Sequence, residues 1–148
     1  VFECIRTTTF KNIHFVALGD PVNTEIPNVS FIKSTSDERL LSIIYAAADA
    51  FLLPSREDNL PNMMLESLSC GIPVLATPIG GIIDTIETGF TGILSAEVSV
   101  SAIREILIEF DNGKFSFDNT AIRSFAVQNF DLSVQAKKYI KLYSDILS

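Results

Sequence analysis

The stretch that decides the fold is AFLLPSREDNLPNMMLESLSCGIPVLA, residues 50–76. It opens with four apolar residues that end at Pro54, a pattern typical of a short buried strand. A helix is predicted to begin at Pro61, because proline lacks the N–H that would have no partner in a first turn. Gly71 suits the left-handed position that follows a helix. A second apolar run comes directly after it, so the stretch predicts strand, polar loop, helix and strand in succession.

The same alternation extends on both sides of this stretch. Thr35 and Glu38 have the spacing of a capping box at the start of another helix. From Ser99 onward, apolar residues recur only at helical spacing, which predicts three helices with lysines of the last one facing solvent. The other expected elements are strands at 13–18 and 29–32, a turn at Gly19-Asp20-Pro21, a helix from 35 to 48, a short helix at 82–87 and a strand near 93–94.

Strands that alternate with helices at this spacing predict an α/β domain with a Rossmann-like, doubly wound parallel sheet and C-terminal helices. The strands are continuously apolar, as expected where helices cover both faces of the sheet. Ligands of such folds bind beyond the carboxyl ends of the strands. The polar loop at 54–61 is therefore the expected place for function.

Composition excludes several classes of protein. The 148 residues fit one domain and are 47% hydrophobic, and the net charge of −7 argues against nucleic acid as a partner. No window is apolar enough for a transmembrane segment. Cys4 and Cys70 form no CxxC pair, so no disulfide framework is expected. The chain opens with Val1, without an initiator methionine or a basic leader, and we expect it to be part of a longer protein.

The sequence lacks the motifs of several other classes of enzyme. It contains no Asp-x-Asp for a metal-bridged diphosphate, no Gly-x-Gly-x-x-Gly or Walker motif, and no Gly-x-Ser-x-Gly elbow. The single histidine, His14, lies in a predicted strand and is expected to be structural. We therefore expect neither a metal site nor a serine–histidine site.

Two acidic residues, Asp58 and Glu66, are separated by seven positions, and the second falls inside the predicted helix. With its flanks, VALGDP at 16–21, ADAFLL at 48–53 and IGG at 79–81, this pattern resembles the retaining GT-B glycosyltransferases of group 1, or family 4 type. That family includes sucrose-phosphate synthases and many bacterial polysaccharide enzymes. The resemblance implies that residues 1–148 are a nucleotide-sugar-binding C-terminal domain, which lacks its first strand and the N-terminal acceptor domain.

The resemblance also assigns roles to residues. Glu66 would bind the ribose hydroxyls and Asp58 the hydroxyls of the donor sugar, although Glu57 stands beside Asp58 and either can reach the sugar. The backbone of four following residues would bind the diphosphate and sugar: Asn59, Leu60, Pro61 and Asn62. The base would lie near Ile32 and Lys33. No catalytic residue is expected within this chain, and the family's phosphate-neutralising Arg and Lys would lie upstream.

Elementary chemistry agrees with these roles. A helix that begins at Pro61 offers unpaired N–H groups and a positive dipole end to a pyrophosphate. A carboxylate accepts hydrogen bonds only, which suits the neighbouring hydroxyls of a sugar. Such a helix end contributes about 0.3–2 kcal/mol to the binding of an anion.

The leading interpretation is metal-independent, cofactor-free transfer of a sugar, with retained configuration, from a nucleotide diphosphate sugar to a glycan or lipid-linked glycan. We expect a cytoplasmic protein, with any peripheral membrane association supplied by the absent domain, and an inactive isolated chain. The alternative is a module that binds a nucleotide sugar or a partner protein without chemistry. A third interpretation, a nucleotide-sugar epimerase of the same architecture, fits the acidic pair and its flanks less well.

Overall fold

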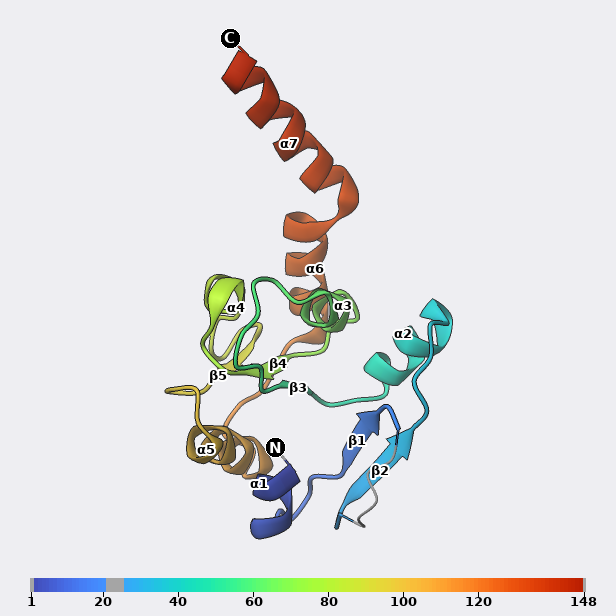
Figure 1. Cartoon of the computed structure of the whole chain (residues 1–148), viewed down its shortest axis with the longest axis vertical. Coiled ribbons are helices and arrows are strands. Elements are labelled where there is room, and N and C mark those ends of the chain that lie inside the picture. Colours follow the sequence, from blue (N-terminus) through green and yellow to red (C-terminus); the bar gives the residue numbers. More distant parts are fainter. Residues whose placement is uncertain (1, 21–25, 148) are drawn as a thin grey trace.

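A computed structural model of the chain describes residues 2–20 and 26–147 (Figure 1). The helices are α1 (Phe2–Thr7), α2 (Glu38–Ala46), α3 (Asn62–Ser69), α4 (Gly80–Thr85), α5 (Val100–Asp111), α6 (Asn119–Phe130) and α7 (Leu132–Leu147). The strands are β1 (Phe15–Leu18), β2 (Val29–Ile32), β3 (Phe51–Leu53), β4 (Val74–Ala76) and β5 (Gly92–Leu94). All the predicted strands and helices are present, and the end of the predicted turn at Pro21 lies outside the described residues.

The five strands form two parallel sheets. β4 lies between β3 and β5, and β1 pairs with β2. Phe51 of β3 is in register with Val74 of β4, which in turn pairs with Gly92 of β5. The prediction of a parallel α/β fold is confirmed, and the strands of the described residues are divided between a two-stranded and a three-stranded sheet.

Helices cover both faces of the three-stranded sheet (Figure 1). Val74 and Ala76 of β4 pack on one side in an apolar cluster with Met64 of α3 and Ile122 of α6. Leu75 points to the other side, into a cluster built by α5 and the segment around Phe10. Every residue of β4 is buried. The continuous apolar strand at 73–76 is therefore explained by burial on two faces.

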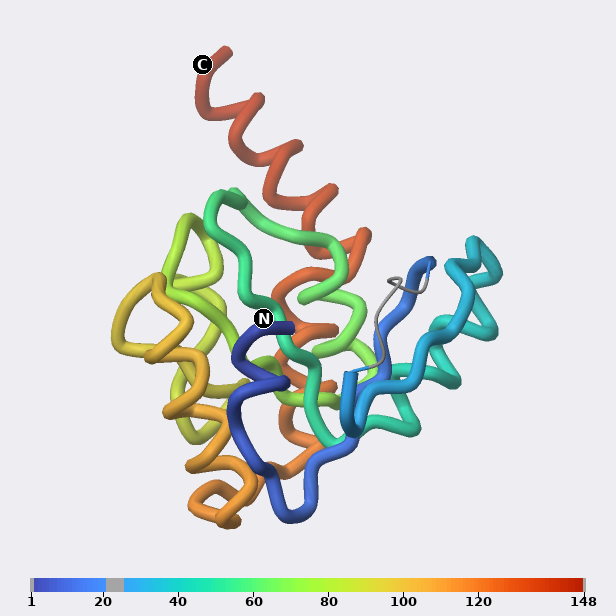
Figure 2. The backbone as a smooth tube through the Cα atoms, turned by 60° about the horizontal axis from the view of Figure 1, so that its bottom comes forward, coloured from blue at the N-terminus to red at the C-terminus, as the bar shows by residue number. Residues whose placement is uncertain are grey.

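The amino-terminal segment is fastened to α5. α1 lies beside α5 (Figure 2), and Arg104 donates a hydrogen bond of 3.3 Å to the Thr7 hydroxyl. The Asp111 carboxylate, at the end of α5, accepts from the backbone N–H groups of Lys11 at 2.7 Å and Asn12 at 2.8 Å. These backbone donors lower the pKa of Asp111 below its ordinary value. The segment that leads into β1 is thereby held against the helix.

The capping box predicted at Thr35 and Glu38 is wrong. The N-cap of α2 is Asp37, whose carboxylate accepts from the N–H groups of Arg39 at 2.9 Å and Leu40 at 3.3 Å. Thr35 instead accepts from the N–H of Asp37 at 3.1 Å. Aspartate and threonine are both good N-caps, and the sequence offered one of each two residues apart. The helix begins at the later one.

The last helix, α7, projects away from the body of the domain (Figure 1). Lys137, Lys138 and Lys141 are exposed, as predicted. The five residues predicted to form its apolar face are exposed as well, with between 58% and 86% of their surface accessible: Tyr139, Ile140, Tyr143, Ile146 and Leu147. Over residues 2–20 and 26–147, no helix has the length and apolarity needed to cross a membrane.

Candidate functional site

The loop at residues 54–61 leaves the carboxyl end of β3 and enters α3, where the parallel fold is expected to place a ligand. Thr77, just after β4, fastens this loop to the end of the neighbouring strand. Its hydroxyl donates to the carbonyl of Ser55 at 2.5 Å, and its N–H donates to the carbonyl of Leu53 at 3.4 Å. Buried Thr77 therefore holds the base of the loop, while residues 56–60 stay exposed.

The tip of the loop rests on the amino end of α4. The carbonyl of Asn59 accepts from the N–H of Gly81 at 2.5 Å. Gly80 has a φ of +45°, and a Cβ on it would meet the carbonyl oxygen of Asp58. Only glycine allows this approach without strain. The backbone of Asp58 and Asn59 is thus positioned by α4, whose amino end is occupied by the protein's own carbonyl.

The amino end of α3 differs from those of the other long helices. Side chains of Asp37, Ser99 and Asp118 cap α2, α5 and α6. At α3 the N-cap is Pro61, and among the described residues no side chain caps the first turn. The bond from the N–H of Met64 to the carbonyl of Pro61, 3.1 Å long, tightens this turn. The end of α3 that follows the acidic loop therefore carries backbone donors without a side-chain acceptor, as an anion site requires.

Glu66 lies on α3, one turn beyond this end, with its side chain exposed. One carboxylate oxygen, Oε2, accepts a hydrogen bond of 3.1 Å from the hydroxyl of Tyr45 on α2. Burial of the phenol and the negative charge of Glu66 raise the pKa of Tyr45 well above its ordinary value. Tyr45 is therefore the donor in this bond at neutral pH.

The other predicted site residues lie together in the loop. Glu57, Asp58, Asn59 and Leu60 are exposed, Pro61 is buried, and Asn62 is exposed at the start of α3. In the described residues the side chains of Glu57 and Asp58 form no hydrogen bond or ion pair, so both carboxylates are free to meet a ligand. Their roles, and that of Glu66, stay predictions.

Residues predicted to be structural behave as such. His14 is exposed before β1, and its ring nitrogen Nε2 lies 2.9 Å from the Ser30 hydroxyl of β2. Cys70 is half-buried at the end of α3, and burial raises the pKa of its thiol. Gly71 follows with a φ of +82°, the left-handed conformation predicted for it. Across the described residues, no group of three or more His, Cys, Asp or Glu side chains is arranged to hold a metal ion.

Three hydrogen bonds that position the site are not predictable from the sequence. The Tyr45 hydroxyl donates to Glu66, the Thr77 hydroxyl donates to the carbonyl of Ser55, and the N–H of Gly81 donates to the carbonyl of Asn59. Tyr45 and Glu66 are 21 residues apart, and Thr77 and Ser55 are 22 apart. No local pattern connects such pairs. The one signal in the sequence is the Gly80–Gly81 pair, because a double glycine after a strand can mark a close backbone approach.

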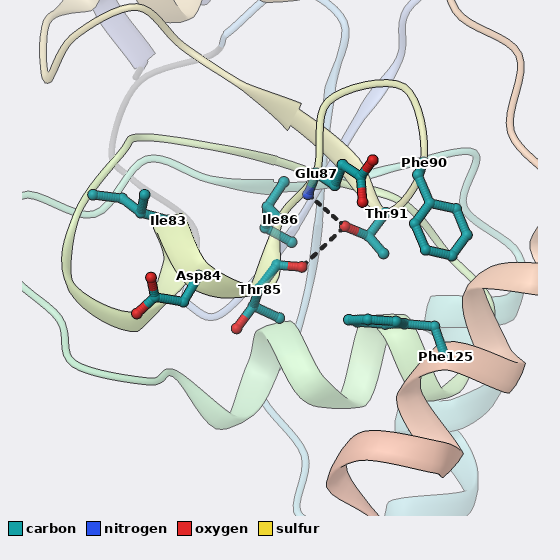
Figure 3. A pocket seen from close by; sticks show the side chains of 8 residues that line it. All are labelled: Ile83, Asp84, Thr85, Ile86, Glu87, Phe90, Thr91 and Phe125. Carbon is teal, nitrogen blue, oxygen red and sulfur yellow. Dashed lines mark hydrogen bonds between the residues drawn. The ribbon is translucent and has the colours of Figure 1, made fainter.

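A shallow pocket lies away from this loop, between α4, the turn into β5 and α6 (Figure 3). Its lining residues are Ile83, Asp84, Thr85, Ile86, Glu87, Phe90, Thr91 and Phe125. The Thr91 hydroxyl donates to the carbonyl of Thr85 at 3.1 Å and accepts from the N–H of Glu87 at 2.8 Å, so it is already satisfied. None of the predicted site residues lines this pocket, and it is separate from the candidate site.

Comparison with known proteins agrees with the fold and the motif. Residues 2–110 match the family described as Glycosyl transferases group 1. A glycogen synthase of Thermodesulfovibrio yellowstonii is 36% identical over 124 residues, which cover 82% of this chain and 25% of that protein. The apo form of the lipopolysaccharide outer core galactosyltransferase WaaB has a TM-score of 0.79 at 19% identity, over 97% of this chain and 44% of that chain. Anabaena Alr3699/HepE in complex with UDP has a TM-score of 0.63 at 24% identity, over 79% of this chain and 32% of that chain.

The parallel sheet between helices, with its polar loop at the strand ends, has the architecture of one half of a GT-B glycosyltransferase. The chain belongs to the glycosyl transferases group 1 family. The predicted family and fold class are confirmed. The matched part spans about a quarter of the glycogen synthase and less than half of WaaB.

Proposed function

We propose that this chain is the donor-binding domain of a glycosyltransferase, and that it binds a nucleotide diphosphate sugar between the 54–61 loop and α3. The observation that carries the proposal is the uncapped amino end of α3, with Asp58 just before it and Glu66 one turn after it. The equivalent end of α4 is occupied by the carbonyl of Asn59. Of these two neighbouring helix ends, only that of α3 is left for the diphosphate of a ligand.

In this proposal each group performs one task on the donor. Glu66 accepts from the ribose hydroxyls, and Asp58 or Glu57 accepts from hydroxyls of the sugar. The backbone N–H groups at Asn62 and Met63 bind the diphosphate, together with the backbone of Asn59, Leu60 and Pro61. When the glycosidic bond breaks, negative charge grows on the leaving nucleotide diphosphate. The fixed dipole and donors of α3 stabilise that charge most strongly in the transition state.

The finer features of the reaction belong to the same proposal. Transfer proceeds with retention of configuration, without a metal ion or other cofactor, to an acceptor such as a glycan or a lipid-linked glycan. The protein acts in the cytoplasm, where nucleotide sugars would reach it, and any membrane association comes through its other domain. UDP and UDP-glucose complexes of the structural neighbour Alr3699/HepE support a nucleotide-sugar donor.

A strand supplied by the preceding part of the protein would join the two sheets. β1 and β3 each pair with one strand, so each leaves an edge without a strand partner in the described residues. Phe15 of β1 and Leu52 of β3 nevertheless pack in one apolar cluster. A helix that enters a parallel strand, as α1 enters β1, is the usual crossover from an earlier strand. We place that strand between β1 and β3.

The exposed apolar face of α7 supports a second domain as its partner. Tyr139, Ile140 and Tyr143 would be costly to leave in water, because each buried side chain contributes about 1.5–3 kcal/mol. In the full-length protein, replacing Ile140 with Asp is expected to lower the midpoint of thermal unfolding by several degrees. Lys141→Ser, a change on the same helix, is the control and is expected to leave it unchanged. Equal midpoints for Ile140→Asp and wild type would contradict a packed α7.

The direct test of the proposed function is calorimetric titration of the full-length protein with UDP, GDP and ADP. One of the three is expected to bind with a dissociation constant in the micromolar range, and its sugar derivative to be turned over. Binding without any turnover of a sugar derivative would identify the non-catalytic module instead. No binding of any of the three would refute the donor-binding function and leave only a module that binds a partner protein.

A further inference from the structure

The hydrogen bond between Tyr45 and Glu66 joins two helices at the candidate site. The Tyr45 hydroxyl, near the end of α2, lies 3.1 Å from Oε2 of Glu66 on α3. The Tyr45 ring stands edge-on against Phe51 of β3, with ring centroids 5.6 Å apart and an interplanar angle of 78°. Packing against Phe51, the half-buried first residue of β3, restricts the ring, so the hydroxyl is presented from a defined position.

A second contact one turn away keeps the two helices in register. The thiol of Cys70, four residues beyond Glu66, lies 4.0 Å from the carbonyl of Ser42, three residues before Tyr45. Positions three and four apart lie on the same face of a helix. Both contacts therefore belong to one seam between α2 and α3. The hydrogen bond between Tyr45 and Glu66 therefore follows from the packing of α2 against α3, and not only from the rotamer of one side chain.

Only half of the Glu66 carboxylate is used by this bond. Oε2 accepts from Tyr45, while Oε1 has no hydrogen bond among the described residues. A carboxylate has lone pairs for about four donors, and a donor that fixes one oxygen also fixes the plane of the group. The raised pKa of the half-buried Tyr45 phenol keeps its proton in place at neutral pH. The bond can thus persist while a ligand binds to the other oxygen.

We propose that Tyr45 is a positioning residue for Glu66 and that it sets the preference of the site for a nucleotide with an intact ribose diol. The inference rests on the proposed function, in which Glu66 accepts from the ribose hydroxyls. Tyr45 does not contact the donor. It holds the carboxylate in the orientation that receives two neighbouring hydroxyls, and so lowers the entropy that Glu66 would lose on binding.

The experiment compares the full-length wild type with Tyr45→Phe, which keeps the ring against Phe51 and removes only the hydroxyl. UDP, GDP and ADP are titrated, and the tightest is compared with its 2′,3′-dideoxy analogue. The ratio of the two dissociation constants reports the ribose preference. It is expected to fall by about three- to tenfold in Tyr45→Phe, the effect of one hydrogen bond to a charged group at an accessible site.

Two further variants separate positioning from other effects. Ser42→Ala removes a hydroxyl from the same helix; among the described residues this hydroxyl donates to the carbonyl of Arg39 alone, and its loss should leave the ratio at its wild-type value. In a Glu66→Ala background, where Tyr45 has no acceptor at this position, adding Tyr45→Phe should change the ratio by less than twofold, since its effect passes through the Glu66 carboxylate. A full effect of Tyr45→Phe in that background would overturn the inference, because Tyr45 would then act on the ligand directly.

The failure of this inference is distinguishable from that of the proposed function. A wild type that prefers the ribose nucleotide, together with an unchanged preference in Tyr45→Phe, would overturn the role of Tyr45 alone. A wild type that binds the ribose and dideoxy forms equally would overturn the role of Glu66, and the inference with it. Absence of binding by all three nucleotides would overturn the proposed function itself.

Discussion

A full-length protein carrying Glu66→Ala is expected to lose at least about 100-fold in kcat/KM for the nucleotide-sugar donor. The substitution removes the proposed acceptor of two ribose hydroxyls, and hydrogen bonds to a charged group contribute about 1.5–3 kcal/mol each. It also leaves the hydroxyl of the half-buried Tyr45 without its hydrogen-bond acceptor, Oε2 of Glu66. Steady-state kinetics with varied donor concentration measures the loss, and affinity for the nucleotide diphosphate should fall as well.

Glu105→Ala is the matched control for this prediction. Glu105 is an exposed glutamate on α5, a helix that covers the opposite face of the three-stranded sheet from α3. Its removal changes the net charge equally but leaves the candidate site untouched, so wild-type kinetics are expected. Transfer at the wild-type level by Glu66→Ala would contradict the role given to this carboxylate.

The second large effect is expected at Gly80. Replacement by Ala introduces a Cβ against the carbonyl oxygen of Asp58 and places a side chain on a residue with a φ of +45°. The backbone at Asp58 and Asn59 cannot remain on α4, and the bond from the N–H of Gly81 to the Asn59 carbonyl is lost. A displacement of about 1 Å at a reacting centre can cost about 100-fold in rate. We expect a loss of that order in kcat/KM.

Gly89→Ala separates displacement of the loop from backbone strain in general. Gly89 has a φ of +90°, but a Cβ there would meet no atom of the described residues within 4 Å. The variant should lose about 1 kcal/mol or more of unfolding free energy from strain, measured by urea titration, and keep its kcat/KM. If Gly89→Ala lowers kcat/KM as much as Gly80→Ala does, displacement of the 54–61 loop is not the cause of the loss of activity in Gly80→Ala.

Much of the fold was predictable because local signals were strong. Four apolar residues ending at Pro54, and the apolar run at 73–76, indicated β3 and β4, and β4 is apolar throughout because it is buried on both faces. Pro61 and Gly71 bracketed α3 because each favours one end of a helix. The spacing of Asp58 and Glu66 then led to the family, which the match over residues 2–110 confirms.

The features that escaped prediction depend on contacts across the fold. The division of the strands into two sheets depends on which strands pair, and the sequence of a single strand does not determine its pairing partner. The choice of Asp37 over Thr35 as the N-cap of α2 was a competition between two suitable residues. At the candidate site, Tyr45 escaped notice because its partner Glu66 lies on another helix. Predicting it required the docking of α2 on α3.

The central claim is that the amino end of α3 receives the diphosphate of a nucleotide sugar while Glu66 binds the ribose. A crystal structure of the full-length protein with its nucleotide diphosphate tests this most directly. The claim predicts phosphate oxygens within about 3 Å of the backbone nitrogens of Asn62 and Met63, and a ribose hydroxyl on Oε1 of Glu66. A diphosphate bound elsewhere, with the end of α3 facing only solvent, would contradict it.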